Sequence, residues 1–565
     1  MVKKKSLKYK NILTFLIALG VILAVNFIAS KKYARIDLTE DDRFTLTEAS
    51  ENVVKKLDDV VEFKVYLEGE NLPAKYVEFR EEIKSRLEEF RNLNPEFVEY
   101  EFIDPHAAEN PDEFVASLRK KGLLFTNDVE KTENGVNQIQ IIPGILVYYK
   151  GKSYPINLLK SDIRKSIESI EYELVAAIKI LTTTFQNRKN VGLLQGHGEL
   201  FPEEVADLSS SIVQFYNPAI VRLRDSMGRV DIKNLFLSDI LIIAKPDPRA
   251  PFSEGEIYAL DQYVMRGGKI IWMLDQVSAD EDSLRDRSFF VANINKLGTE
   301  DLLYHYGVRV NNNLLQDLQC SVINATVGVE ANGQPKNQLI PWFYAAVVNS
   351  QNNHIINKNI DPIRLNFANT IDTIPSAGIT KTVLLASSNS SKILKAPVRV
   401  GIDGSVKALQ EGVDKTQFKD SQKPIAVLLE GSFDSYYKNR IPPAAPFEFI
   451  KKSQKSKMIV ISDGDIARNK VNPYTGAFEP LGMDRKAQYF FDNKKFLMNA
   501  LNYLSGDEDL IPARCKRIEI RLLDRGLIKE KKKLIQAVNV LIPVLLIVIA
   551  GLLYNFLRTR KYTRK

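Results

Sequence analysis

Cysteine and histidine are scarce in this chain. Its 565 residues include two cysteines, Cys320 and Cys515, and four histidines. Two cysteines without a CxxC pair exclude a disulfide-rich scaffold and the thioredoxin-type redox motif. We expect two separate free thiols, although a disulfide between them is compatible with an oxidising compartment.

The short motifs that bind nucleotides or activate a nucleophile are also missing. No GxxxxGK(S/T) phosphate loop occurs, which indicates that the chain has no ATPase site of its own. The strand-like segment KIIWMLD ends at Asp275 without the Gly-x-Ser-x-Gly or Gly-x-Cys-x-Gly pattern of a nucleophile elbow. The sequence therefore predicts no catalytic residue and no cofactor.

The excess of positive over negative charge comes from the two ends of the chain. The net charge is +8, and ten positive residues without any acid lie in residues 1–10 and 558–565, which leaves −2 for the remainder. Because the bulk of the chain is nearly neutral, the basic balance gives no support for nucleic-acid binding. The two basic tails are instead suited to anionic lipid headgroups.

Two long runs contain no charged residue. They are residues 11–30 and residues 534–557, which are 20 and 24 residues long. Because a helix rises about 1.5 Å per residue, each run is long enough to cross a hydrocarbon layer of roughly 30 Å. Pro543 lies in the second run, and proline is tolerated in membrane helices. We therefore predict one transmembrane helix at each end; the alternative is a pair of buried core helices.

The basic tails also predict the orientation of the chain. Positive residues are retained on the cytoplasmic side of a membrane, so both termini should be cytoplasmic and the bulk of the chain should lie outside. No small-x-small cleavage site follows the first run, since Phe27 stands where a small residue is required. We expect an uncleaved anchor.

Residues 31–187 are predicted to form a first outer domain. Thr47 is placed to cap a helix that runs through Leu57. The segment VEFKVYLE alternates like a strand, and AKYVEFREEIKSRLEEFRNL has helical spacing. A strand, a helix and the strand pair in IQIIPGILVYYKGKSYPINLL follow. This β-α-β-α-β-β order resembles a thioredoxin-like fold without its redox motif.

A second domain is predicted from residues 188–301 and 456–515. The apolar runs NVGLLQ, DILIIAKP, KIIWMLD and KMIVISDGD are typical of buried parallel strands, and helical segments separate them, as in a doubly wound α/β sheet. A helix in DNKKFLMNALNYLSG should end near Gly506. Residues 302–455 carry short strand-like runs and are expected to be a β-rich insertion. Residues 516–533 are assigned to a juxtamembrane linker.

The main candidate site is the turn formed by Gly196, His197, Gly198 and Glu199. It follows a predicted strand, where open α/β sheets bind ligands. Phe201 replaces the third glycine of GxGxxG, which excludes a dinucleotide loop, and one histidine with one glutamate is a weak metal signal. The turn is therefore either a ligand or partner loop, or a tight structural turn whose polar side chains bond nearby backbone.

Three aspartates are secondary candidates. Asp275 follows one predicted strand, and Asp463 and Asp465 follow another. Paired acids can bind a cation, but the spacing does not match an EF-hand, and aspartates that only form a turn are the alternative. The sequence therefore predicts no metal site here.

An ordered set of segments resembles a known family. These segments are RIDLTEDDRFTLTEAS, GLLQGHGEL, DILIIAKPDPRAPFSEGEIYALDQYVMRGGKIIWMLD, VISDGDIARN and FLMNALNYLSGDEDLIPAR. Together with the two anchors, they resemble the gliding-motility ABC-transporter auxiliary protein family, GldG, over nearly the whole chain. The expected β-rich insertion carries little of the resemblance.

The resemblance implies a non-catalytic membrane subunit. Its implied partners are a membrane permease subunit and a cytoplasmic ABC ATPase in the inner membrane of gliding and related Gram-negative bacteria, with two copies per complex as one arrangement. The α/β domain is implied to be amidotransferase-like and to lack the nucleophile. The large periplasmic part would then couple ATP hydrolysis to events in the envelope.

Two other functions stay open. A periplasmic ligand-binding module would hold a glycan or a peptide with the loop from Gly196 to Glu199. A hydrolase with an unrecognised site would need a nucleophile, a base and an orienting group, and the sequence shows no such set at a readable spacing.

Overall fold

We describe the protein from a computed structural model. The structure describes residues 45–69, 72–132, 135–160, 163–225, 227–285, 287–329, 333–350, 353–472, 475–508, 510–514 and 525–563, together with scattered positions between 13 and 24. The chain divides into two compact units, Met1–Lys516 and Arg517–Lys565, and each is described by itself.

The first part of the larger unit is built on a four-stranded sheet in the order β2-β1-β5-β6. Its strands are β1 (Val61–Val65), β2 (Val98–Phe102), β5 (Gly144–Tyr149) and β6 (Lys152–Asn157). The β1–β2 pair is parallel, and the β1–β5 and β5–β6 pairs are antiparallel. The accompanying helices are α2 (Glu48–Lys55), α3 (Ala74–Leu93), α4 (Pro111–Lys120) and α5 (Ile163–Thr182). The predicted β-α-β-α-β-β order is thus present, while the thioredoxin-like assignment stays a prediction.

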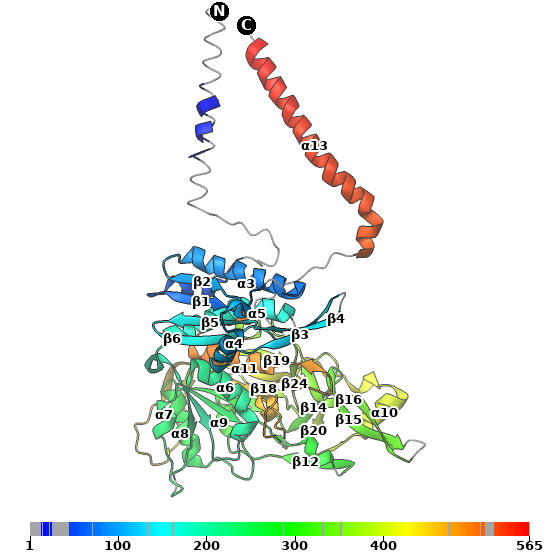
Figure 1. Ribbon diagram of the computed structural model, residues 1–565. Coiled ribbons are helices and arrows are strands. Elements are labelled where there is room, and N and C mark those ends of the chain that lie inside the picture. Colours follow the sequence, from blue (N-terminus) through cyan, green and yellow to red (C-terminus); the bar gives the residue numbers. More distant parts are fainter. Residues whose placement is uncertain are drawn as a thin grey trace, which may run out of the picture. The chain divides into compact units, whose positions relative to one another are not determined.

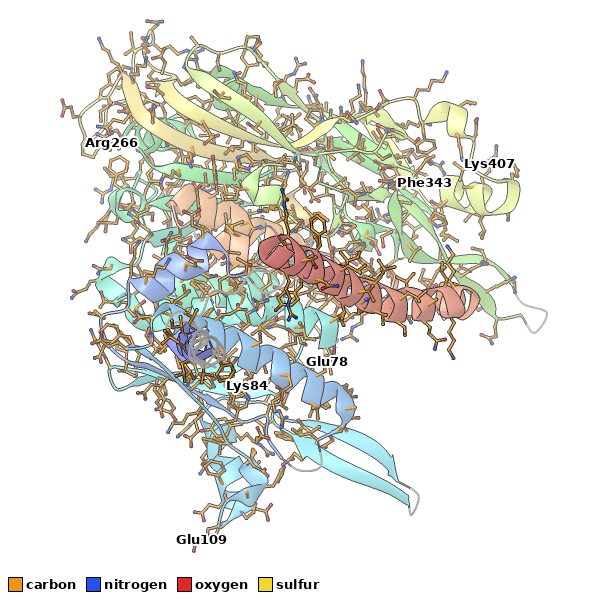
Figure 2. The ribbon with its side chains drawn as sticks, turned by 90° about the horizontal axis from the view of Figure 1, so that it is seen from above. Glu78, Lys84, Glu109, Arg266, Phe343 and Lys407 are labelled. Carbon is orange, nitrogen blue, oxygen red and sulfur yellow. The ribbon has the colours of Figure 1, made fainter. Side chains whose placement is uncertain are left out.

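A β-hairpin that the sequence did not reveal extends from this part. It consists of β3 (Thr126–Thr132) and β4 (Gly135–Ile141), which pair antiparallel with each other and with no other described strand. Figures 1 and 2 both show the hairpin projecting away from α3 and the four-stranded sheet.

A mixed seven-stranded sheet forms the centre of the same unit, in the order β19-β22-β23-β10-β9-β7-β8. Its strands are β7 (Asn190–Leu194), β8 (Asn217–Val221), β9 (Ile240–Ala244), β10 (Lys269–Met273), β19 (Ile379–Ala386), β22 (Pro424–Asp434) and β23 (Lys452–Ile461). The five strands from β23 to β8 are parallel, and β22 and β19 continue the sheet with antiparallel pairs. The four strands predicted from the apolar runs are therefore confirmed as neighbours.

Helices cover both faces of the seven-stranded sheet. On one face α6 (Ala206–Phe215) and α11 (Asn493–Ser505) pack with buried residues such as Ile242 and Ile459. On the other face α8 (Glu254–Met265) and α9 (Glu300–Tyr306) pack with Ile243 and Trp272. The continuous apolar strands follow from burial on both faces. Shorter helices are α7 (Lys233–Leu237) and α12 (Leu510–Arg514).

The segment expected to be a β-rich insertion is only partly separate from this sheet. Residues 302–455 contain β19 and β22, which are strands of the seven-stranded sheet. The remaining strands near it form small sheets: β11 (Val277–Ser278), β12 (Phe289–Ile294), β13 (Val308–Val310), β14 (Asn313–Asp317), β15 (Cys320–Val329), β16 (Pro335–Val348), β17 (Ile363–Arg364), β18 (Ile371–Thr373), β20 (Ser391–Lys395) and β21 (Val398–Gly401). Helix α10 (Asp403–Glu411) contacts β16, and Figure 2 shows Lys407 of α10 on the same side of the unit as Phe343 of β16.

The second unit consists of one long described helix, α13 (Arg525–Thr563), which contains Pro543. Within the part of the chain that the structure describes, residues Gln536–Arg560 are long and apolar enough to cross a membrane, with a mean hydropathy of 2.6 and no burial inside the protein. This agrees with the second predicted span. The first predicted span, residues 11–30, lies mostly outside the described residues and stays a prediction.

The two-faced burial of the central sheet can be tested with one pair of variants. Ile459 of β23 is fully buried, whereas Ile220 of the edge strand β8 is 48% exposed. Ile459→Ala should lower the free energy of unfolding by about 2–5 kcal/mol, and Ile220→Ala by about 1 kcal/mol or less. Urea unfolding of the detergent-solubilised chain, followed by tryptophan fluorescence, measures both, because Trp272 lies within this sheet. Equal losses would contradict the arrangement.

Candidate functional site

The structure brings all the predicted site residues to one edge of the seven-stranded sheet. Parallel strands have their carboxyl ends at the same edge. The turn from Gly196 to Glu199 follows β7, Asp275 follows β10, and Asp463 and Asp465 follow β23. Together with three residues that were not predicted, Glu256, Arg224 and Lys245, they form two groups. These are here named the histidine cluster (His197, Glu199, Glu256 and Arg224) and the aspartate cluster (Asp275, Asp463, Asp465 and Lys245).

The backbone of the Gly-His-Gly-Glu turn requires glycine at two positions. Gly196 and Gly198 have φ angles of +126° and +71°, which side chains disfavour. A Cβ on Gly198 would lie 2.5 Å from the Cβ of Asp247, so space as well as φ requires glycine there. The Asp247 amide donates to the His197 carbonyl at 2.7 Å, which fixes the turn against the loop that follows β9.

The His197 side chain is buried between two carboxylates. It is 1% exposed and stacks on Phe252, with ring centroids 4.1 Å apart. Its Nε2 atom lies 3.1 Å from Glu256 Oε1, and its Nδ1 atom lies 3.4 Å from Glu199 Oε1. Glu199 is itself 4% exposed, and its other oxygen accepts a hydrogen bond from the His197 backbone amide at 2.8 Å.

Glu256 and Arg224 complete the histidine cluster, and neither was predicted from the sequence. Glu256 lies in the first turn of α8 and forms a capping box with Ser253, whose amide and hydroxyl both donate to Glu256 Oε2. Arg224 donates from Nε and Nη2 to the two Glu256 oxygens at 2.6 and 2.7 Å. The Ser-x-x-Glu spacing at residues 253–256 is a sequence signal that points to the glutamate as a helix cap.

The charges in this cluster compensate one another. Burial alone would lower the pKa of His197, but its interactions with Glu199 and Glu256 outweigh burial and raise the pKa from 6.5 to about 9. Burial would raise the pKa of Glu256, but hydrogen bonds from His197, Arg224 and Ser253 hold it far below the usual range. His197 is therefore an imidazolium at neutral pH, which disfavours a role as general base or metal ligand.

The aspartate cluster surrounds the ammonium group of Lys245. Lys245 Nζ lies 2.5 Å from Asp465 Oδ2 and 3.3 Å from Asp275 Oδ2. Asp275 Oδ1 accepts a hydrogen bond from the Gly464 amide at 2.6 Å. A Cβ on Gly464 would lie 2.8 Å from the Lys245 side chain, so glycine lets the two loops approach.

Asp463 has a structural role in this cluster. It is fully buried, and its two oxygens accept hydrogen bonds from the Asp465 amide at 2.8 Å and from the Asn366 amide at 2.7 Å. The first bond closes a short turn. The second fastens a loop from residues 302–455 to the carboxyl end of β23.

Burial governs the ionisation of the aspartate cluster. It raises the pKa of Asp275 to about 6 despite the attraction of Lys245, and it raises the pKa of Asp463 well above 3.8, with neighbouring aspartates adding to the rise. Burial would lower the pKa of Lys245, but Asp275 and Asp465 raise it above 10.5. The lysine thus supplies the positive charge that a bound cation would bring.

Other candidate residues are not part of these clusters. Within the described residues, no group of three or more His, Cys, Asp or Glu side chains has an arrangement that could hold a metal ion. Cys320 is a free thiol whose pKa burial raises to about 12, and Cys515 lies outside the described residues.

Two family models match the chain. One, described as an ABC-type uncharacterized transport system, matches residues 188–500, which include every strand of the seven-stranded sheet and both clusters. The other, a domain of unknown function (DUF7088), matches residues 40–148, which include most of the four-stranded sheet. A search of the curated proteins finds no match.

The raised pKa of His197 predicts a specific dependence of stability on pH. A histidine whose folded pKa lies near 9 stabilises the fold fully below pH 6.5, and this contribution is lost as the pH rises from about 6.5 through 9. The melting temperature of the normal chain should fall over this range by more than that of His197→Gln. The control His305→Gln, whose ring contacts the Asp434 carbonyl, should keep the normal profile. Parallel profiles for His197→Gln and the normal chain would contradict the buried imidazolium.

Removal of the Lys245 ammonium should leave buried carboxylates without compensation. We expect Lys245→Met to lower the free energy of unfolding at pH 7 by about 3–5 kcal/mol, the range for breaking a buried ion pair. Adding Asp275→Asn should restore part of this loss, because it removes the carboxylate that is left without a cation, whereas Asp465 keeps its contact with Arg468. Chemical unfolding of the two variants measures the difference. A double variant no more stable than Lys245→Met would argue against the pairing.

Proposed function

This chain belongs to the ABC-type uncharacterized transport system family, and we propose that it is a non-catalytic, membrane-anchored auxiliary subunit of an ABC-transporter complex. The family match over residues 188–500 carries this proposal. The motif for binding ATP is missing from the sequence, so the ATPase and the permease would be separate chains.

The membrane anchor supports a role beside a permease. The apolar stretch Gln536–Arg560 of α13 is long enough to span a membrane and would offer a surface for lipid or for other membrane helices. With the first predicted span, it would place both termini in the cytoplasm and residues 31–533 in the periplasm of a bacterial inner membrane. The large outer part would then couple ATP hydrolysis by the separate ATPase to gliding or to another envelope process, with two copies per complex as one arrangement.

The chemistry of the two clusters favours the non-catalytic role over a hydrolase. The histidine cluster pairs its two cations with its two carboxylates, and His197 is both buried and protonated. The aspartate cluster is already compensated by Lys245. A buried, paired group is poorly placed to take a proton from a substrate.

The alternative is a periplasmic module that binds a glycan or a peptide with the loop from Gly196 to Glu199. In that case His197→Ala with Glu199→Ala should abolish function while folding and complex assembly persist. The burial of both side chains favours the structural turn, for which the same double substitution should lower stability first.

Purification in mild detergent tests the proposed complex. A tagged full-length chain, expressed with the permease and ATPase encoded in its own organism, should retain both in stoichiometric amounts through size-exclusion chromatography. A truncation after residue 524, which removes α13, should lose most of the permease. If the full-length chain emerges alone from membranes that contain both partners, the proposal fails.

A further inference from the structure

A large polar cavity lies beside the aspartate cluster. Its volume is about 920 Å³, within the range of sites for small molecules. One wall comes from the carboxyl edge of the seven-stranded sheet, including Asp465 and Arg468. The opposite wall comes from residues 302–455, including Asn324 of β15 and Arg364 of β17. The cavity is therefore at the edge where open α/β sheets bind ligands, but away from the Gly-His-Gly-Glu turn.

Arg364 is held firmly in the wall of this cavity by its backbone. Its amide donates to Asn493 Oδ1 at 3.0 Å, and its carbonyl accepts a hydrogen bond from Asn493 Nδ2 at 2.7 Å. Asn493 is the first residue of α11, so the arginine is fixed to a rigid element. Its side chain is only 12% exposed.

The guanidinium of Arg364 has unused hydrogen-bond donors. Its Nε atom lies 3.3 Å from Asp484 Oδ2, and Nη2 lies 3.9 Å from Glu281 Oε2. Among the described residues Nε has no hydrogen-bond partner, although Asp484 is within ion-pair range, and the carboxylate nearest to Nη2 is too distant for a hydrogen bond. A guanidinium carries five donors in a planar fork, and leaving them unsatisfied inside a protein is costly.

The other cations of the cavity fall into two kinds. Arg468, Lys486 and Arg285 are paired, since they lie 2.5, 2.5 and 2.9 Å from the carboxylates of Glu204, Glu281 and Asp282 respectively. Lys470 and Arg287 are exposed, and neither has an ion-pair partner within the residues that the structure describes. An anion in the cavity would thus meet one fixed fork and two adaptable positive side chains, beside carboxylates of which most are paired with the other cations.

We propose that this cavity binds a small anionic ligand, whose carboxylate or phosphate group is held by the guanidinium of Arg364. Arginine forms two parallel hydrogen bonds to either group, which gives geometric specificity as well as energy. Lys470 and Arg287 supply further positive charge at the opening, and the volume leaves room for a ligand much larger than the oxyanion itself. This site does not depend on the proposed transporter complex.

Thermal unfolding of the full-length chain in detergent tests the site with two probes. Inorganic phosphate and succinate are each titrated against sodium chloride at equal ionic strength, so that general screening is subtracted. We expect at least one probe to raise the melting temperature in a saturable way. Saturation by phosphate alone or by succinate alone would identify the group that the site prefers. If neither anion acts beyond chloride, the proposal is wrong.

Variants separate the cavity from other positive surfaces. Arg364→Gln should weaken binding of the active probe about tenfold or more, which is the usual cost of a lost charge-assisted hydrogen bond. Arg364→Gln also leaves the buried Asp484 without this cation. Lys470→Gln combined with Arg287→Gln therefore provides a second test at exposed positions and should weaken binding several-fold. Lys84→Gln on α3, labelled in Figure 2, is the control and should bind normally. Normal binding by a folded Arg364→Gln or by the double variant would overturn the proposal.

Discussion

The parallel pairing of β23, β10, β9 and β7 is the constraint on which the central part of the protein depends. It buries the four strands on both faces and directs the loops that follow them to a single edge. Polar side chains buried at that edge lose their contacts with water. Each therefore needs a hydrogen-bond or ion-pair partner within the protein. The two clusters and the left-handed turn at Gly198 are local solutions to this common problem.

The pairing of charges then limits the chemistry that the side chains at this edge can perform. In the histidine cluster two acids face two cations, and in the aspartate cluster Lys245 stands between Asp275 and Asp465. Such closed networks stabilise a particular loop arrangement, but they leave no strong base or open metal position. Arg364 differs from these groups, because its backbone is fixed while its guanidinium lines a cavity, with Nε 3.3 Å from Asp484 Oδ2. The position of Arg364 in the wall of a cavity is a better guide to a binding site here than the glycine-rich turn.

The sequence predicted features that depend on local patterns. Thr47 caps α2 and Gly506 ends α11 in a left-handed conformation, as propensity alone indicates, and the long apolar runs became the central strands. Prediction from the sequence failed where the strands that pair lie far apart along the chain. The β8 segment has an exposed surface and contains Pro218, so it lacked a strand signal, and nothing local assigned β19 and β22 to the central sheet. Placing His197, Asp275 and Asp463 at one edge was possible from topology. The partners Glu256, Arg224 and Lys245 were not predictable in the same way, because their contacts bridge segments far apart in sequence.

The incorporation of β19 and β22 into the central sheet also has a mechanical consequence. Strand β22 is hydrogen-bonded to β23 along most of its length, and Asn366 and Arg364 are tied to β23 and α11 at its carboxyl edge. The segment 302–455 therefore cannot swing on a hinge as a tethered lobe would. A force applied to the outer strands of this segment would act on the hydrogen bonds between β22 and β23 in shear. The segment and the rest of the seven-stranded sheet would therefore move together.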